Sequence, residues 1–163
     1  MLGRLFPHPY LTALLVVTWL LLVNGWSLGN LVLAIILGTV IPLLTAPYWP
    51  NAPKMRNIPA MIEYILVVLW DIVVSNVIVA RIVLFMPNDK LRPGWIAVPL
   101  DLTSPEAITV LAGTVTMTPG TVSSDMSACG RVLLVHCLHA PDPDATRDGI
   151  KNRYEARLKR IFE

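Results

Sequence analysis

Charge is scarce in the first half of this sequence. The charged side chains of residues 1–86 number only six, namely Arg4, Lys54, Arg56, Glu63, Asp71 and Arg81. Over all 163 residues 15% are charged and 55% are hydrophobic, which is too little charge and too much apolar content for an ordinary soluble domain. The composition therefore indicates a membrane protein. The formal net charge of +2 argues against nucleic-acid binding, which requires a strong positive field.

Cysteine is equally rare, and metal-ligand spacing is lacking. The two cysteines, Cys129 and Cys137, lie eight residues apart, too few for a disulfide framework or a metal knuckle. His136, Cys137 and His139 lie too close together on one expected strand to form a metal site by themselves. We therefore expect reduced thiols, no bound metal and no cofactor.

Glycine is also sparse where a phosphate cradle would need it. The segment TMTPGT, residues 116–121, has one glycine and no lysine, and a strand rather than a helix is expected after it. A catalytic alternative casts Thr121, His136 and Asp125 as nucleophile, base and orienting acid. No second oxyanion donor accompanies them, so we favour a structural corner. Pro119 ends a helix, and Pro119–Gly120 is the preferred pair of a type II turn.

Three long apolar segments are present, at about residues 10–23, 28–46 and 58–86. A helix needs about 20 apolar residues to cross the hydrocarbon core of a bilayer. Asn24–Gly25 is a strong turn signal, so the first two segments are expected to form a short helical hairpin. Trp26, Tyr48 and Trp49 at the segment ends are typical of membrane interfaces. We predict three transmembrane helices, the third of them long.

The third segment contains three charged residues. Glu63 and Arg81 lie about 27 Å apart along a helix, near opposite membrane interfaces. Asp71 falls near the middle of the membrane, where a carboxylate costs at least ~2.5 kcal/mol. We favour a hydrogen bond from a neighbouring helix to Asp71, and a place on an ion or proton path is the alternative. Either role predicts that this helix packs against other protein through Asp71.

The orientation in the membrane is not decided by charge alone. With three crossings, the side that holds the N-terminus has three basic residues, Arg4, Lys54 and Arg56. The other side also has three near the membrane, Arg81, Lys90 and Arg92. The positive-inside count is therefore a tie. Two unpaired cysteines suit a reducing compartment, so we expect the polar half in the cytoplasm.

The polar half, residues 91–163, predicts a small α+β domain of order βαββα after a membrane region of residues 1–90. Residues 95–102 form a strand with Pro99 at an edge. Residues 104–117 form a helix capped by Ser104. Residues 121–127 and 131–138 form a hairpin that turns at Gly130. The last helix, capped by Asp142 or Asp144, presents an apolar stripe made of Ile150, Tyr154, Leu158 and Ile161. We expect Glu155 to face Lys159 on its exposed side.

These segments together resemble a known family, the E-type subunits of the multisubunit Mrp-type Na⁺/H⁺ antiporter. The resemblance rests on LLLVNGWSLGNLVLAIILG, YILVVLWDIVVSNVIVA, ITVLAGTVTMTPGTVSSD, LLVHCL and RYEARLKRIF, which span nearly the whole chain in order. The most specific part is T-x-T-P-G-T, followed about fifteen residues later by V-H. Met117 stands where the family usually has leucine, a mild exchange.

The resemblance implies a non-enzymatic accessory subunit of an inner-membrane monovalent cation/proton antiporter. Its partners would be the lipid bilayer and the other subunits, and the larger subunits would handle most of the Na⁺ and H⁺ transport. It also implies a structural role for the residues at the family's motif positions, which are Thr116, Thr118, Pro119, Gly120, Thr121, Asp125, His136 and Glu155. The alternative function is a free-standing, membrane-tethered ligand-binding or sensor domain.

Overall fold

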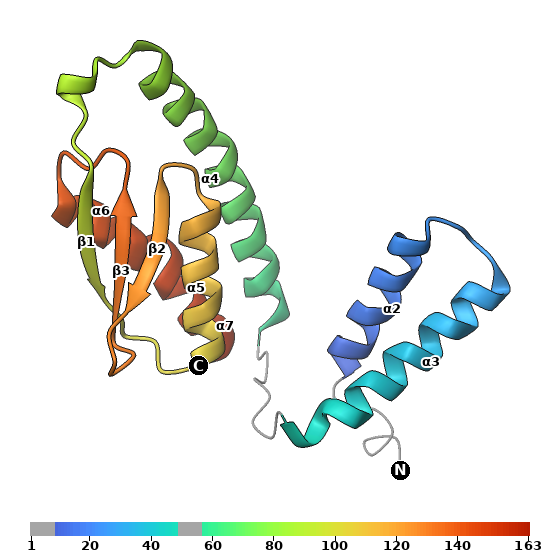
Figure 1. The fold of residues 1–163 in the computed structure, drawn as a ribbon. Helices are drawn as coiled ribbons and strands as arrows, with labels where there is room; N and C mark the ends of the chain where they lie inside the picture. Colours follow the sequence, from blue (N-terminus) through green and yellow to red (C-terminus); the bar gives the residue numbers. More distant parts are fainter. Residues whose placement is uncertain (1–8, 49–56) are drawn as a thin grey trace. The chain divides into compact units, whose positions relative to one another are not determined.

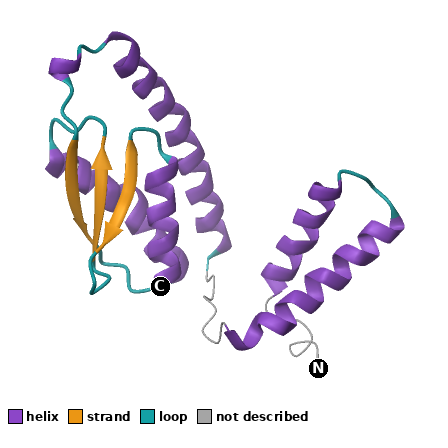
Figure 2. Cartoon of the chain, in the orientation of Figure 1, coloured by secondary structure: helices purple, strands orange, loops and turns teal. Residues whose placement is uncertain are grey.

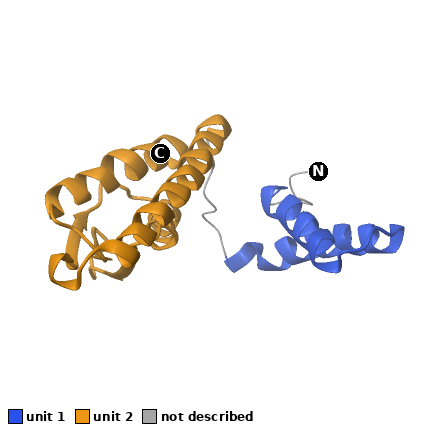
Figure 3. Ribbon diagram, turned by 90° about the horizontal axis from the view of Figure 1, so that it is seen from above, with its two compact units in different colours: residues 1–52 blue, residues 53–163 orange. Residues whose placement is uncertain are grey.

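The computed structural model describes residues 9–48 and 57–163 of the chain (Figures 1 and 2). The chain divides into two compact units, residues 1–52 and 53–163 (Figure 3). From the sequence alone, the boundary is expected at residue 90 instead. The difference arises because the third apolar helix packs onto the α+β elements and shares their core.

The first unit contains a helical hairpin. Helix α2 (Pro9–Val23) is followed by α3 (Leu28–Thr45) and a 3₁₀ turn, η1 (Ala46–Tyr48). The connection bends at Asn24, whose φ of 47° lies in the left-handed region that asparagine tolerates. Ser27 caps α3 by accepting a hydrogen bond from the backbone N–H of Asn30 at 3.1 Å. The predicted turn is therefore confirmed.

Small residues line the buried face of α3. Ala34, Gly38 and Pro42 are buried at four-residue intervals, which places them on one side of the helix. A Cβ at Gly38 would lie 2.7 Å from Val16 Cγ2 and 3.1 Å from the carbonyl oxygen of Thr12. Only glycine therefore allows α2 and α3 to approach this closely.

Replacing Gly38 by leucine is expected to destabilise the hairpin by about 1–3 kcal/mol, because the larger side chain overpacks the contact. The measurement is the thermal midpoint of the full chain in detergent. Gly29→Leu is the matched control, since the nearest atom to a Cβ at Gly29 is 3.9 Å away. Equal midpoints for the two variants would contradict close packing at Gly38.

Helix α4 (Ile58–Phe85) is capped at its N-terminus by Asn57, whose side chain accepts a hydrogen bond from the N–H of Ala60 at 3.0 Å. By length and composition, two helices in the described ranges could cross a membrane, at Leu28–Tyr48 and Ile58–Phe85, and Pro9–Val23 is shorter. The prediction of long apolar helices followed by a small sheet domain is confirmed at this level. One face of α4 is buried against the α+β elements, through Ala60, Tyr64, Val68 and Asp71.

The chain then passes through a 3₁₀ turn, η2 (Asn88–Lys90), into the α+β elements. These are β1 (Gly94–Pro99), α5 (Pro105–Met117), β2 (Thr121–Met126), β3 (Val132–Cys137), α6 (Pro143–Ile150), a π-helical turn η3 (Lys151–Glu155) and α7 (Ala156–Phe162). The sheet is antiparallel in the order β1-β3-β2. Pro99 therefore lies on an edge strand, as predicted.

The core lies on one face of this sheet. Alternate residues of β1 and β3 are buried, including Ile96, Val98, Leu133 and Val135, as expected where one face is covered. Figure 1 shows α6 passing behind the sheet and α7 lying behind α5, and α5 packs beside β2. Ser104 caps α5 as predicted, and Asp142 caps α6.

The predicted exposed pairing of Glu155 with Lys159 is wrong. Glu155 is only 3% exposed and forms its ion pair with Lys151 at 3.0 Å. The π-helical turn at residues 151–155 inserts one residue into the helix. This shifts Glu155 onto the buried side, alongside the apolar stripe.

Candidate functional site

The two acidic residues of α4 both face arginines of the C-terminal helix. Asp71, only 8% exposed, accepts hydrogen bonds from Nε and Nη2 of Arg153, each at 2.5 Å. This is the bidentate geometry that guanidinium and carboxylate groups favour. About two turns earlier on α4, Glu63 pairs with Arg157 at 3.1 Å and Arg160 at 3.2 Å.

The order of these pairs shows that the two helices run antiparallel. Asp71, the later acid of α4, pairs with Arg153, the first of the three arginines. Glu63, the earlier acid, pairs with Arg157 and Arg160, which follow it. Segments more than eighty residues apart are thus joined by charge. We call this set, Glu63, Asp71, Arg153, Arg157 and Arg160, the acid–arginine ladder.

Buried polar contacts extend the ladder into the core. The hydroxyl of Tyr154 donates to Asp71 at 3.0 Å. The hydroxyls of Tyr64 on α4 and Thr114 on α5 lie 2.7 Å apart in a buried hydrogen bond. Because buried polar groups are costly without partners, these bonds fix the position of α4 on the α+β elements.

Burial and, secondarily, the hydrogen bond to Asp71 raise the pKa of Tyr154 to about 12 from an ordinary 10.0. The folded unit therefore prefers the neutral phenol. This stabilisation is complete below pH 10 and is lost as pH rises through about 12.

The ionisation of Tyr154 can be followed by ultraviolet absorbance, as the titration curve of wild type minus that of Tyr154→Phe. We expect this difference curve to have its midpoint near pH 12. Tyr48→Phe, at an exposed position, controls for loss of one phenol. A midpoint for Tyr154 near pH 10 would contradict its burial.

The T-x-T-P-G-T motif forms a closed corner between α5 and β2. The N–H of Thr121 donates to the carbonyl of Thr118 at 3.3 Å, closing a turn over Pro119 and Gly120. Gly120 has a φ of 92°, which only glycine adopts easily. Helix α5 ends here, and the freed carbonyl groups need donors.

The three threonines of the motif supply these polar partners. The Thr121 hydroxyl donates to the carbonyl of Val115 at 2.6 Å and lies 3.0 Å from that of Thr118. The Thr118 hydroxyl donates to the Thr114 carbonyl at 2.9 Å. Thr116 accepts a hydrogen bond from the N–H of Ser123 at 3.1 Å. The corner is therefore satisfied internally.

Thr121, His136 and Asp125 do not come together as a catalytic group. Thr121 pairs with Cys137 across the sheet, whereas His136 pairs with Val122, so Thr121 and His136 point to opposite faces. His136 packs edge-on against Trp95, with ring centroids 4.8 Å apart. Asp125 is exposed and accepts a hydrogen bond from the next residue's N–H.

Glu155 is a buried structural acid. Its Oε1 accepts hydrogen bonds from the backbone N–H groups of Asp101 at 2.5 Å and Leu102 at 3.1 Å. Its Oε2 pairs with Lys151, which also donates to the Pro99 carbonyl at 2.6 Å. Glu155 thus binds the loop between β1 and α5 to the C-terminal helix.

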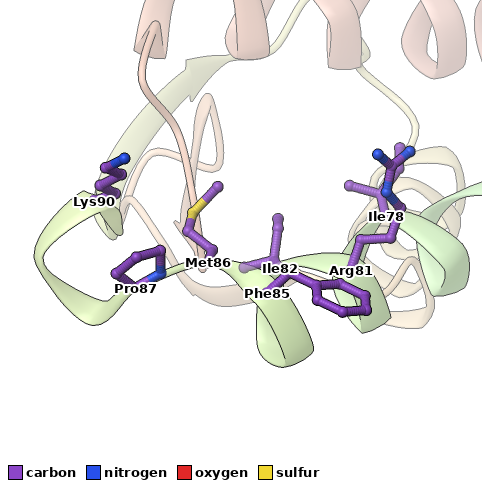
Figure 4. A pocket seen from close by; sticks show the side chains of 7 residues that line it. All are labelled: Ile78, Arg81, Ile82, Phe85, Met86, Pro87 and Lys90. Carbon is purple, nitrogen blue, oxygen red and sulfur yellow. The ribbon is translucent and has the colours of Figure 1, made fainter.

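Arg81 lies apart from the ladder. It is exposed and lines a cleft at the end of α4 with Lys90 (Figure 4). In residues 9–48 and 57–163, no three His, Cys, Asp or Glu side chains are grouped to hold a metal. Cys129 is exposed and Cys137 is buried, both as free thiols, and burial raises the pKa of the Cys137 thiol.

The basic half of the ladder was not predicted from the sequence. Arg153, Arg157 and Arg160 occur at intervals of four and three residues, which places them on one helix face. An arginine stripe on one helix and two acids on a distant apolar helix together are the signal that could have indicated that the two helices pair. The contact itself joins distant segments, and a single sequence does not reveal it.

Comparison with known proteins gives consistent matches over almost the whole chain. The family model described as "Na+/H+ ion antiporter subunit" matches residues 12–161. A protein of Rhizobium meliloti, named as the probable E component of a K(+)/H(+) antiporter, is 34% identical over 97% of this chain and 98% of its own length. The E component of the Na(+)/H(+) antiporter of Alkalihalophilus pseudofirmus is 24% identical over 93% of this chain and 95% of its own length.

A solved structure has a similar fold. A chain of the membrane-bound sulfane sulfur reductase, an archaeal respiratory membrane complex, superposes with a TM-score of 0.75. The superposition covers 98% of this chain and 99% of that one, at 24% sequence identity. The family match and the identity to the Rhizobium protein confirm the resemblance drawn from the sequence: the chain belongs to the family of E-type Na⁺/H⁺ antiporter subunits.

Proposed function

We propose that this chain is an accessory subunit of a multisubunit monovalent cation/proton antiporter, and that it contributes assembly and stability rather than a segment of the ion path. The relatives are named as antiporter subunits, so this chain is expected to work with other subunits in a membrane. The acid–arginine ladder is the observation that supports a structural role.

Glu63 and Asp71 are the only two acids of the third apolar segment. A carboxylate on a proton or cation path must exchange its ligand during each cycle, whereas Asp71 is held by both arms of one guanidinium and by a tyrosine hydroxyl. Breaking such a partly buried pair is strongly unfavourable. The ladder therefore favours the packing role for Asp71 over the transport role.

The same contacts bear on membrane topology. The α+β elements pack along α4, and residues 87–163 carry nine basic and nine acidic side chains. Such a charged unit is excluded from hydrocarbon, so α4 cannot cross the bilayer while it is packed in this way. We propose two crossings, by α2 and α3, with α4 at the membrane surface.

Two crossings also resolve the tie in positive charge. The N-terminus and residues 49–163 then lie on one side with all thirteen basic residues, and the connection Asn24–Ser27 on the other side carries no charge. By the positive-inside rule the α+β unit is cytoplasmic. This proposal replaces the expected three crossings and keeps the expected orientation of the polar half.

The decisive experiment is Asp71→Asn in a strain that lacks the native gene. We expect the variant to lower the amount of chain in the membrane and of partner subunits that purify with it, with cation/proton exchange falling in proportion. Asp89→Asn is the matched control, because Asp89 is an exposed acid without an ion pair in residues 57–163. Full assembly of the Asp71 variant with no exchange would place Asp71 on the ion path and overturn the proposal.

A further inference from the structure

One face of the sheet is covered by no element of residues 57–163. Directly paired residues of neighbouring strands point to the same face, so the register places the outward side chains in three rows across the strands. Trp95 and Val122, on the two edge strands, are 62% and 48% exposed. We call this surface the open sheet face, and its residues are Trp95, Ala97, Pro99, Val122, Asp125, Val132, Leu134 and His136.

The open sheet face is apolar at most of its positions. An antiparallel sheet with one face in water normally alternates apolar and polar residues along each strand. Strands β1 and β3 instead contain nearly continuous apolar runs, WIAVP and VLLVHC, which are typical of strands buried on both faces. The helices of this chain cover only the other face. We therefore expect another molecule to cover the open sheet face.

Asp125 is the one charged residue of the open sheet face. It is exposed and forms no ion pair within residues 57–163. A second copy of the chain, packed through the same face, would add a second acid and no base, and a buried acid without a counter-charge is costly. An anionic lipid surface would repel the carboxylate as well. A protein with a basic side chain opposite Asp125 satisfies the charge.

The open sheet face is also turned away from α4. Helix α4 contacts α5 through Tyr64 and the C-terminal helix through Asp71, and these helices lie on the covered side of the sheet. The outer side of α4, with exposed Leu66, Trp70 and Leu84, points away from them. A bilayer along that outer side would leave the open sheet face accessible to the soluble parts of other subunits.

Trp95 is well placed to anchor such a contact. Its ring packs edge-on against that of His136, with centroids 4.8 Å apart, and Val122 completes the same row of the sheet. Tryptophan is enriched among the few interface residues that carry most of the binding energy. Because the ring already packs against a neighbour, ordering it on binding costs little freedom.

We propose that the open sheet face docks an apolar segment from the soluble part of another antiporter subunit, with a lysine or arginine opposite Asp125. The apolar rows pack against that segment, and Asp125 forms an ion pair with its basic residue. The inference rests on the proposed function, because it requires other subunits. It adds the surface by which this chain binds one of them and the chemistry of the segment that is bound.

The test replaces Val122 by the photoreactive residue benzoylphenylalanine in the full chain, produced in a strain that lacks the native gene. After irradiation of native membranes, we expect one adduct whose peptides identify a subunit that also co-purifies with this chain. The same replacement at Val73, 59% exposed on the outer side of α4, is the matched control and should not cross-link to that subunit. An adduct with a second copy, no protein adduct, or equal adducts from both positions would overturn the proposal.

Two substitutions in the photoreactive chain test the chemistry of the contact. Asp125→Lys should lower the yield of the adduct about tenfold or more, because it reverses one member of a buried interfacial charge pair. Trp95→Ala should have a similar effect through loss of the anchor. Asp89→Lys, the same charge change at an exposed acid outside the open sheet face, is the matched control. An unchanged yield in either test variant would contradict the proposed contact.

Co-purification of subunits with the wild-type chain is scored separately. If subunits co-purify and Val122 gives no adduct, this inference fails and the proposed function stands. If no subunit co-purifies, the proposed function fails as well.

Discussion

A chain that begins at residue 91 should fail to fold, whereas one that begins at residue 57 should fold. Removing α4 strips Tyr64 and Val68 from the core and leaves Thr114 and Arg153 without their partners. Loss of one large buried side chain costs about 3–5 kcal/mol, and a small domain has only about 5–15 kcal/mol of stability in total. The combined loss should therefore exceed what the α+β elements can sustain.

The two fragments are compared by far-ultraviolet circular dichroism and resistance to proteolysis. Both are kept in mild detergent, because the outer side of α4 is apolar. The longer fragment should unfold cooperatively and the shorter one should be degraded rapidly. Cooperative unfolding of residues 91–163 with an equal midpoint would instead support an independent domain, as a tethered sensor requires.

Glu155→Ala should destabilise the chain by about 3–5 kcal/mol, the range for removing one partner of a buried charge pair. The substitution leaves the N–H groups of Asp101 and Leu102 unpaired and deprives Lys151 of one of its acids. The measurement is the free energy of unfolding from denaturant titration of the full chain in detergent.

Asp125→Ala is the matched control, since Asp125 is also an acid of the family motif but is exposed. Its effect should stay within about 0.5 kcal/mol. Glu155→Gln should fall between the two, because an amide oxygen still accepts from the backbone but cannot pair with Lys151. Equal losses for Glu155→Ala and Asp125→Ala would contradict the structural role of Glu155.

Local chemistry made several features predictable from the sequence. Asn24–Gly25 indicated the turn between α2 and α3, and Ser104–Pro105 indicated the start of α5. Pro119–Gly120 indicated the corner before β2. Each of these depends on neighbouring residues, so a single sequence contains the information.

The placement of α4 depends on distant residues and was not predictable in the same way. Its hydropathy equals that of α3, which favoured a third membrane crossing. The contacts of α4 with Thr114, Arg153 and Arg157 are the observation that supports the proposed position at the membrane surface instead. The inward turn of Glu155 depends on a π-helical insertion at residues 151–155, and the helical period alone placed that residue on the wrong side.

Affinity purification of the tagged chain from native membranes in mild detergent tests membership of a multisubunit complex most directly. The family assignment and the acid–arginine ladder predict that the chain elutes together with large polytopic membrane proteins, and that Asp71→Asn reduces their recovery. Elution of the wild-type chain as a stable, lone monomer would contradict an accessory role.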